Sequence, residues 1–255
     1  MSKSPALNYK YFSHSGKILA SALLLSKKLA RPGITTVEID FKIHNFIVKY
    51  KAIPSFLGLN GYAHASCISI NNQVVHGAPT NIPLKLGDLI TVDIGVSYKN
   101  HCTDAARTFV IGAPTTEQQN LIDTSKSALD SGIKEAITGN RIGDISYAIQ
   151  RCVELNGFRS PLDYGGHGIG FKPHLNPFIS NTGIKGKGKK LIEGQGLALE
   201  PIVMAGSIEI FIDGVDECTC YSKDGALSAH IEDTIIVSDL IPLILTRETL
   251  NGGIV

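Results

Sequence analysis

Apolar residues recur at helical spacing in several stretches of the chain, and local signals mark where these stretches begin and end. Thr35 and Thr36 are N-cap residues before one such stretch, and Pro54 follows its end. Arg31-Pro32-Gly33 ends an earlier one. The pattern predicts helices over residues 16–29, 37–51, 116–136 and 144–156.

Short runs rich in β-branched residues predict strands between and after the helices. Two of them, 89–95 and 102–111, form a hairpin across the polar link 97–100. The others are 67–70, 74–76, 197–203, 208–212 and 227–237. No linker or internal repeat divides the chain, so we expect one domain over residues 1–255. Its fold class is α+β, with helices packed on a curved antiparallel sheet.

Composition narrows the range of partners. Of the 255 residues, 43% are hydrophobic and 18% are charged, as in an ordinary globular enzyme. The net charge of +1 gives no field that attracts nucleic acid or anionic membrane. The apolar run 18–25 is far shorter than the roughly 20 residues of a membrane span and lacks a signal-peptide cleavage pattern. We therefore expect a cytoplasmic monomer with no membrane or specific nucleic-acid partner.

The five cysteines are odd in number and show no disulfide spacing, which favours a reducing compartment. Cys218 and Cys220 resemble half of a zinc site, but no second pair completes it, so we disfavour that interpretation. One biased segment, 185–190, carries four lysines. We interpret it as a solvated surface loop, and the alternative is a contact with ribosomal RNA or another anionic partner.

Two aspartates in the predicted hairpin indicate a metal site. Strand alternation places Asp93 on the face opposite Ile90, Val92 and Ile94, and the hairpin brings Asp104 to the same face as Asp93. Neighbouring carboxylates on a largely apolar strand repel each other unless a cation balances them. The alternative is an ordinary exposed hairpin face.

Three further residues extend this set. His167 lies between glycines, Glu200 precedes Pro201 after an apolar run, and Glu232 follows another such run. Each alone is equally consistent with a turn or a solvated strand end. Together they give four carboxylates and one imidazole, a set that suits Mn(II), Fe(II) or Co(II) and is large enough for two ions. Two such ions activate water for hydrolysis. His76 and His174 are further candidates for catalysis.

At this point the chain resembles the methionine aminopeptidases of the pita-bread fold. The order of Asp93, Asp104, His167, Glu200 and Glu232 matches the five metal ligands of that family. Six segments match in order over nearly the whole chain: Cys67-Ile68-Ser69-Ile70-Asn71, Val75-His76-Gly77, Gly87-Asp88 through Asp93, Gly166-His167-Gly168-Ile169-Gly170, Glu200-Pro201 and Glu232-Asp233-Thr234.

The resemblance implies two divalent ions (Co, Mn, Fe or Zn) and a role for each ligand. Asp93 chelates one ion, and Asp104 and Glu232 bridge both. His167 and Glu200 complete the second ion, and Glu200 also takes a proton from the attacking water. The resemblance further implies that His76 bonds the substrate near the scissile amide and that His174 stabilises the tetrahedral oxygen. The implied substrates are nascent polypeptide N-termini, with the ribosome as a possible partner.

The spacing between His167 and Glu200 excludes the insertion of the family's second type, so the chain resembles the short first type without a zinc-finger extension. It departs from that type in three ways. There is no tryptophan, and Cys218 stands near its place; His230 replaces a common glutamine; Pro173 replaces a common phenylalanine. The remaining apolar residues expected to line the methionine pocket are Phe56, Leu59, Tyr62 and Cys67.

Two alternatives stay open. An Xaa-Pro aminopeptidase has similar ligands but an additional N-terminal domain, for which the 75 residues before His76 leave no room. A non-catalytic pita-bread binding protein typically lacks some of the ligands, whereas this chain has all five.

Overall fold

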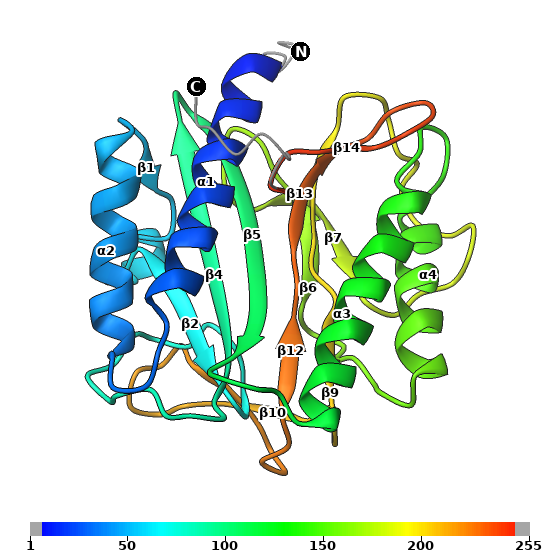
Figure 1. The fold of residues 1–255 in the computed structure, drawn as a ribbon. Coiled ribbons are helices and arrows are strands. Elements are labelled where there is room, and N and C mark those ends of the chain that lie inside the picture. Colours follow the sequence, from blue (N-terminus) through cyan, green and yellow to red (C-terminus); the bar gives the residue numbers. More distant parts are fainter. Residues whose placement is uncertain (1–6, 248–255) are drawn as a thin grey trace.

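The computed structural model describes residues 7–247 as four long helices on two antiparallel sheets, with two smaller strand groups below (Figure 1). The helices are α1 Tyr9–Leu29, α2 Thr36–Lys49, α3 Thr116–Glu135 and α4 Ile142–Leu155, with a short 3-10 turn η1 at Leu59–Gly61. The strands are β1 Ile53–Pro54, β2 Ser66–Ile70, β3 Gln73–Val75, β4 Leu89–Tyr98, β5 His101–Val110, β6 Gly165–Gly168, β7 Leu175–Ser180, β8 Gly196–Leu199, β9 Ile202–Met204, β10 Ile210–Ile212, β11 Cys220–Ser222, β12 Ser228–His230, β13 Asp233–Ile236 and β14 Leu243–Ile244.

The N-terminal half is built on the hairpin β4–β5. Strands β1 and β2 pair with one edge of β4, and β5 pairs with the other over its full length. Helices α1 and α2 cover one face of this sheet (Figure 1). Ile90, Val92 and Ile94 all pack into the core beneath these helices, as the alternation predicted. The opposite face of β4 is thereby left to carry Asp93.

The C-terminal half has its own sheet and its own core. The strand order is β14-β13-β8-β6-β7, and α3 and α4 pack against it (Figure 1). Below it β12 pairs with β9, and β10, β11 and β3 form a third small sheet. Strand β3 comes from the N-terminal half, so this small sheet ties the two halves together at the base.

The two halves also meet between β5 and the segment that links β12 to β13. The backbones of Ala106 and Glu232 exchange two hydrogen bonds, with N···O distances of 3.3 and 3.0 Å. The Thr234 hydroxyl donates to the Asp104 carbonyl at 2.7 Å and accepts from the Asp104 amide at 2.8 Å. This seam fixes residues 104 and 232 relative to each other.

Most elements lie where the sequence predicts them, with informative exceptions. Helix α1 begins at Tyr9 and not at residue 16, because the side chain of Asn8 caps it by accepting from the Lys10 amide. The predicted strands 197–203 and 227–237 are each divided, at Glu200-Pro201 and at Ile231-Glu232. Residues 165–168 form strand β6, which was not predicted, and neither were β1, β7, β11 and β14.

Two features of the surface bear on partners. In the part of the chain from residue 7 to 247, no helix combines the length and apolar character needed to cross a membrane. The lysine-rich segment 185–190 is exposed along its length, as expected of a solvated loop. Its backbone closes the start of α4, because the Lys187 carbonyl accepts from Gly143 and the Asp144 side chain accepts from Gly186.

Candidate active site

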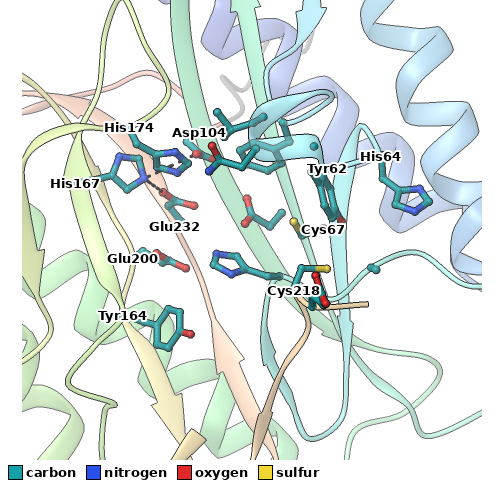
Figure 2. A pocket seen from close by; sticks show the side chains of 18 of the residues that line it. Tyr62, His64, Cys67, Asp104, Tyr164, His167, His174, Glu200, Cys218 and Glu232 are labelled. Carbon is teal, nitrogen blue, oxygen red and sulfur yellow. Dashed lines mark ion pairs between the residues drawn. The ribbon is translucent and has the colours of Figure 1, made fainter. Parts of the chain in front are cut away.

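A cavity of about 870 Å³ opens between the two halves. Its walls include all twelve site residues that were chosen from the sequence. Five are the predicted ligands, two are His76 and His174, and five are the predicted apolar lining, Phe56, Leu59, Tyr62, Cys67 and Cys218. Figure 2 shows His167, Glu200 and Tyr164 on one wall and Tyr62, Cys67 and Cys218 on the opposite wall. We call the side with the carboxylates the acidic end and the side with Tyr62, Cys67 and Cys218 the apolar end, although Asp216 and Glu217, next to Cys218 in the chain, also line the cavity.

The hairpin sets the first two carboxylates. In the β4–β5 register Asp93 lies opposite Ala106 and Asp104 opposite Gly95, so the two aspartates are diagonal neighbours on one face. Residue 95 on this face is a glycine because a Cβ there would lie 2.2 Å from Ser55 Oγ and 2.6 Å from the Phe56 ring. Both aspartates are buried, with exposures of 9% and 2%. The hairpin thus holds two buried acids side by side, as the sequence predicted.

His167 lies in β6, which pairs with β7 along one edge and with β8 along the other. A Cβ on Gly166 would lie 2.3 Å from the Ala198 carbonyl oxygen, and one on Gly168 would lie 2.4 Å from that of Asn176. The flanking glycines therefore serve strand packing, not the turn that a glycine-rich segment suggests. The Nε2 atom of His167 lies 3.9 Å from Asp104 Oδ2 and 3.9 Å from Glu232 Oε1 (Figure 2).

Glu200 and Glu232 lie at the two strand interruptions. Glu200 falls between β8 and β9, where Pro201 cannot donate to a ladder. The Asn181 side chain donates to the Glu200 carbonyl at 2.9 Å and stabilises this break. Glu232 falls between β12 and β13, where its backbone pairs with Ala106. Each break frees a glutamate from strand alternation and lets its side chain face the cavity.

Burial changes the protonation of this acidic group. It raises the pKa of Asp93 to about 7 and the pKa values of Asp104, Glu200 and Glu232 well above their usual range. Repulsion between the neighbouring carboxylates adds to burial for the last three. Burial also lowers the pKa of His167 to about 4. Without a compensating cation, the site therefore favours neutral acids and a neutral imidazole.

The donor atoms fit divalent metal ions. Ligand atoms of Asp93, Asp104 and Glu232 lie within 4.8 Å of one another, and so do those of Asp104, His167 and His174. Across residues 7–247, no hydrogen-bond partner reaches Asp93 Oδ1, Asp104 Oδ1 or Glu232 Oε1. Buried carboxylate oxygens without partners are costly, and a cation resolves that cost.

Two histidines flank the acidic group. The rings of His174 and His167 lie 4.5 Å apart, and the ring of His76 packs edge-on against Tyr164 at 5.8 Å. His76 adopts a left-handed backbone conformation with φ of 58°, which is uncommon for a side chain other than glycine and is typical of functional positions. Burial lowers the pKa of both His76 and His174 below the usual histidine value, so each ring is neutral at pH 7.

The apolar end is held by a local network. The Tyr62 hydroxyl donates to the Ser66 carbonyl at 3.0 Å, and Asp40 accepts from the amides of Ala65 and Ser66. In the turn between β10 and β11, Asp216 accepts from the Cys218 and Thr219 amides at 3.0 and 2.8 Å. These contacts fix Tyr62 and Cys218 at the apolar end of the cavity.

Several lining residues were not identified from the sequence: Tyr164, Phe178, His64, Asp163, Asp216 and Glu217. Tyr164 and Asp163 precede the glycine-flanked histidine in the chain, so their position beside that motif was an available signal. His64, Asp216 and Glu217 lie beside residues already chosen, Tyr62 and Cys218, and Phe178 reaches the cavity from a segment that carries no motif. Packing between distant segments brings them there, and periodicity does not report it.

The comparisons with known proteins agree with this geometry. The profile of metallopeptidase family M24 matches residues 10–239. The chain belongs to metallopeptidase family M24. Among its M24 relatives is the methionine aminopeptidase of Clostridium perfringens, 45% identical over 233 residues that cover 91% of this chain and 93% of the relative. The resemblance to methionine aminopeptidases is thus confirmed, and with it the expected class of enzyme, a metallo-aminopeptidase.

Solved M24 structures share the fold. The methionine aminopeptidase of Thermotoga maritima superposes with a TM-score of 0.91 at 35% identity, covering 94% of this chain and 96% of its own. The pita-bread fold is therefore confirmed. The prolidase of Pyrococcus furiosus reaches a TM-score of 0.74 at 19% identity, and this chain covers 64% of it. That similarity shows the M24 fold alone.

Proposed function

We propose that this chain is a methionine aminopeptidase of the first type that removes the N-terminal methionine from nascent proteins and peptides. This proposal rests on one observation: five proposed metal-binding side chains line a single cavity that also has an apolar end. They are Asp93, Asp104, His167, Glu200 and Glu232. The relatives that match along nine-tenths of the chain and carry that name support the same substrate. The whole chain, residues 1–255, forms one catalytic domain in this proposal; residues 1–6 and 248–255 lie outside the described residues.

In this proposal the acidic end holds two divalent metal ions. Asp93, Asp104, His167, Glu200 and Glu232 would hold these ions, with Asp93 serving the first ion, His167 and Glu200 serving the second, and Asp104 and Glu232 placed near both. When bound, two such ions lower the pKa of water and polarise a peptide carbonyl. Carboxylates and one imidazole accept Co, Mn, Fe or Zn, so the donor set leaves the identity of the ion open.

Side chains around the acidic end handle the proton and the peptide. The Glu200 carboxylate accepts the proton of the attacking water. His174, neutral and beside His167, donates a hydrogen bond to the oxygen of the tetrahedral intermediate, a contribution of about 3 kcal/mol in comparable sites. His76, fixed by its backbone conformation and by Tyr164, bonds the nitrogen of the scissile amide.

Specificity comes from the apolar end. An unbranched thioether buries well against aromatic rings and soft sulfur atoms, and Phe56, Tyr62, Cys67 and Cys218 supply both. An Xaa-Pro aminopeptidase shares the acidic end. The similarity of this chain to prolidases is confined to the fold, so it does not favour that alternative.

The test is turnover of tripeptides by protein that has been stripped with a chelator and reloaded. Met-Ala-Ser, Leu-Ala-Ser and Met-Pro-Ser would be compared under Mn(II), Fe(II), Co(II) and Zn(II). We expect release of methionine from Met-Ala-Ser with at least one ion and none from the stripped protein. No methionine release with any ion would overturn the proposal, and activity without metal would overturn its chemistry.

The cellular setting is part of the proposal. All five cysteines carry free thiols, which fits the reducing cytoplasm. We propose a monomer that meets its substrates as they leave the ribosome. Ribosome contact through residues 185–190 stays a hypothesis: replacing Lys185, Lys187, Lys189 and Lys190 by glutamate should abolish co-sedimentation with ribosomes while leaving tripeptide turnover unchanged. Unchanged co-sedimentation would leave the segment as a solvated loop.

A further inference from the structure

His230 is a buried imidazole without a hydrogen-bond partner. It ends β12, it is 1% exposed, and neither ring nitrogen has a hydrogen-bond partner within 3.5 Å among residues 7–247, although the Val74 backbone lies beside the ring. Its Nε2 atom lies 3.6 Å from Oε1 of Glu200. Buried polar side chains are nearly always paired, and one left unpaired requires an explanation. Because Nε2 faces Glu200, the Glu200 carboxylate is the natural partner of this ring.

His230 does not line the cavity, whereas Glu200 does. A substrate therefore contacts Glu200 and not the imidazole. In the described part of the chain, His230 is also the one basic side chain within 4.0 Å of the Glu200 carboxylate. Any effect of His230 on the reaction consequently passes through Glu200.

The amide and the carbonyl of His230 both bond to the same hydroxyl group. Thr108 Oγ1 donates to the His230 carbonyl at 2.6 Å and accepts from the His230 amide at 3.1 Å. The Thr91 hydroxyl, across the β4–β5 ladder, contacts Thr108 Oγ1 at 2.7 Å. Strand β9 holds the other edge, since His230 pairs with Ile202. A ring on so fixed a backbone has a defined direction.

We propose that His230 is a positioning residue that donates its Nε2–H to the Glu200 carboxylate and fixes the direction of that carboxylate. A small rotation of the Glu200 side chain closes the 3.6 Å separation to hydrogen-bond length. A neutral imidazole has one N–H, so the donation leaves the negative charge of Glu200 available. Outer partners of this kind orient metal-binding carboxylates and tune their affinity. The inference rests on the proposed role of Glu200.

Two amide variants separate this role from simple core packing. In His230→Gln the amide nitrogen falls near the position of Nε2, and in His230→Asn it falls near Nδ1, away from Glu200. Both are polar and smaller than histidine. We expect His230→Gln to keep kcat and Mn(II) affinity within about threefold of wild type. We expect His230→Asn to lose about 10- to 100-fold in both, with KM for Met-Ala-Ser nearly unchanged.

The control is His101→Asn. His101 is also buried, at 5% exposure, but it lies outside the cavity and bonds the Asn8 amide and the Lys99 carbonyl. We expect this variant to lower Tm without changing Mn(II) affinity. Equal losses in the Gln and Asn variants at His230, or wild-type values in both, would overturn the positioning role.

Mn(II) affinity of the stripped protein, measured by calorimetry, requires no turnover. If wild type binds Mn(II) but leaves Met-Ala-Ser intact, the proposed function fails, while the affinities of the two variants still decide the role of His230. If neither variant folds, NMR of ¹⁵N-histidine-labelled wild type gives the answer. A proton on Nε2 of His230 supports the donation, and a proton on Nδ1 alone overturns it.

Discussion

The two halves of the molecule deliver side chains to one cavity by different local structures. The N-terminal half offers Asp93 and Asp104 from a continuous hairpin of two ten-residue strands, where strand alternation sets their direction. The C-terminal half offers His167 from a four-residue strand and Glu200 and Glu232 from points where strands break. The N-terminal half therefore presents its side chains from regular strands, and the C-terminal half presents two of its three from breaks between strands.

This difference affects how rigidly each carboxylate is held and how far its side chain extends. A carboxylate on a paired strand projects from one face of the sheet and has little choice of direction. A glutamate at a break has a longer side chain and a backbone free of alternation, so it depends on specific contacts such as Asn181 and the Ala106 pair. We expect substitutions on the hairpin to act through lost ligands. Substitutions around the breaks should also act through lost orientation.

The largest effect is expected in the group of Asp93, Asp104 and Glu232, to which both halves contribute. Asp104→Asn from the hairpin and Glu232→Gln from the break should each lower kcat/KM by roughly 10³-fold, because a neutral amide is a weak ligand at a site built for charge. The measurement is Met-Ala-Ser turnover at saturating Mn(II). Asp123→Asn on the exposed face of α3 is the control and should behave as wild type. A tenfold difference between the two ligand variants would show that the halves do not contribute equally.

The next effect compares the two histidines, one from each half. His76→Ala, after β3, and His174→Ala, between β6 and β7, should each lower kcat by about 10²-fold, because each acts on the transition state. Mn(II) affinity should change by less than about threefold in His76→Ala. A variant that loses its metal but keeps turnover per bound ion would reassign that histidine as a ligand.

The third effect concerns stability without metal. Burial raises the folded-state pKa of Asp93 to about 7, so this group stabilises the metal-free protein fully below about pH 4 and loses that contribution as pH rises through 7. Relative to Asp93→Asn, chelator-treated wild type should lose more unfolding free energy between pH 5 and 7, because its ionised carboxylate is buried and also repels Asp104, Glu200 and Glu232. The contribution of His167 runs in the opposite direction but is common to both proteins.

Urea unfolding in a chelator at several pH values measures this difference. Saturating Mn(II) should remove most of it, because the bound form keeps Asp93 ionised. Parallel stability curves for wild type and Asp93→Asn would mean that the hairpin carboxylate is not the group that titrates.

The smallest effect concerns the apolar end, where Cys218 stands near the place of a family tryptophan. A cysteine gives less contact than an indole, and one methylene is worth only about 1–3 kcal/mol of discrimination. We expect Met-Ala-Ser to be favoured over Leu-Ala-Ser by less than ~10³-fold in kcat/KM. Cys218→Trp should raise that ratio about tenfold, and Cys218→Ala should not raise it. A wild-type ratio above ~10³-fold would show that Phe56 or Tyr62 closes the pocket instead.

The hairpin half was predictable from the sequence because its signals are local. Alternation in residues 89–95 gave both the buried face and the face of Asp93, and the structure has both. The missed start of α1 also had a local signal, since Asn8 is a capping residue.

The interrupted half was less predictable for a physical reason. Gly166 and Gly168 are required by carbonyls of Ala198 and Asn176, which are distant in the chain, so the sequence favoured a turn where a strand forms. Tyr164 and Phe178 became walls of the cavity through the same kind of packing. The ligands of this half were singled out by their neighbours in the sequence and not by periodicity, each alone was equally consistent with a turn or a solvated strand end, and the resemblance to a family then supported them.

The seam between Ala106 and Glu232 also bears on how the chain opens. Joining these positions closes a long loop, which costs conformational entropy, and it gathers carboxylates that repel one another. An ion that binds only the joined halves stabilises them by mass action, in proportion to the logarithm of its concentration. Metal binding and the separation of the two halves are then one linked equilibrium, and the free ion concentration sets the fraction of molecules in which the halves are joined.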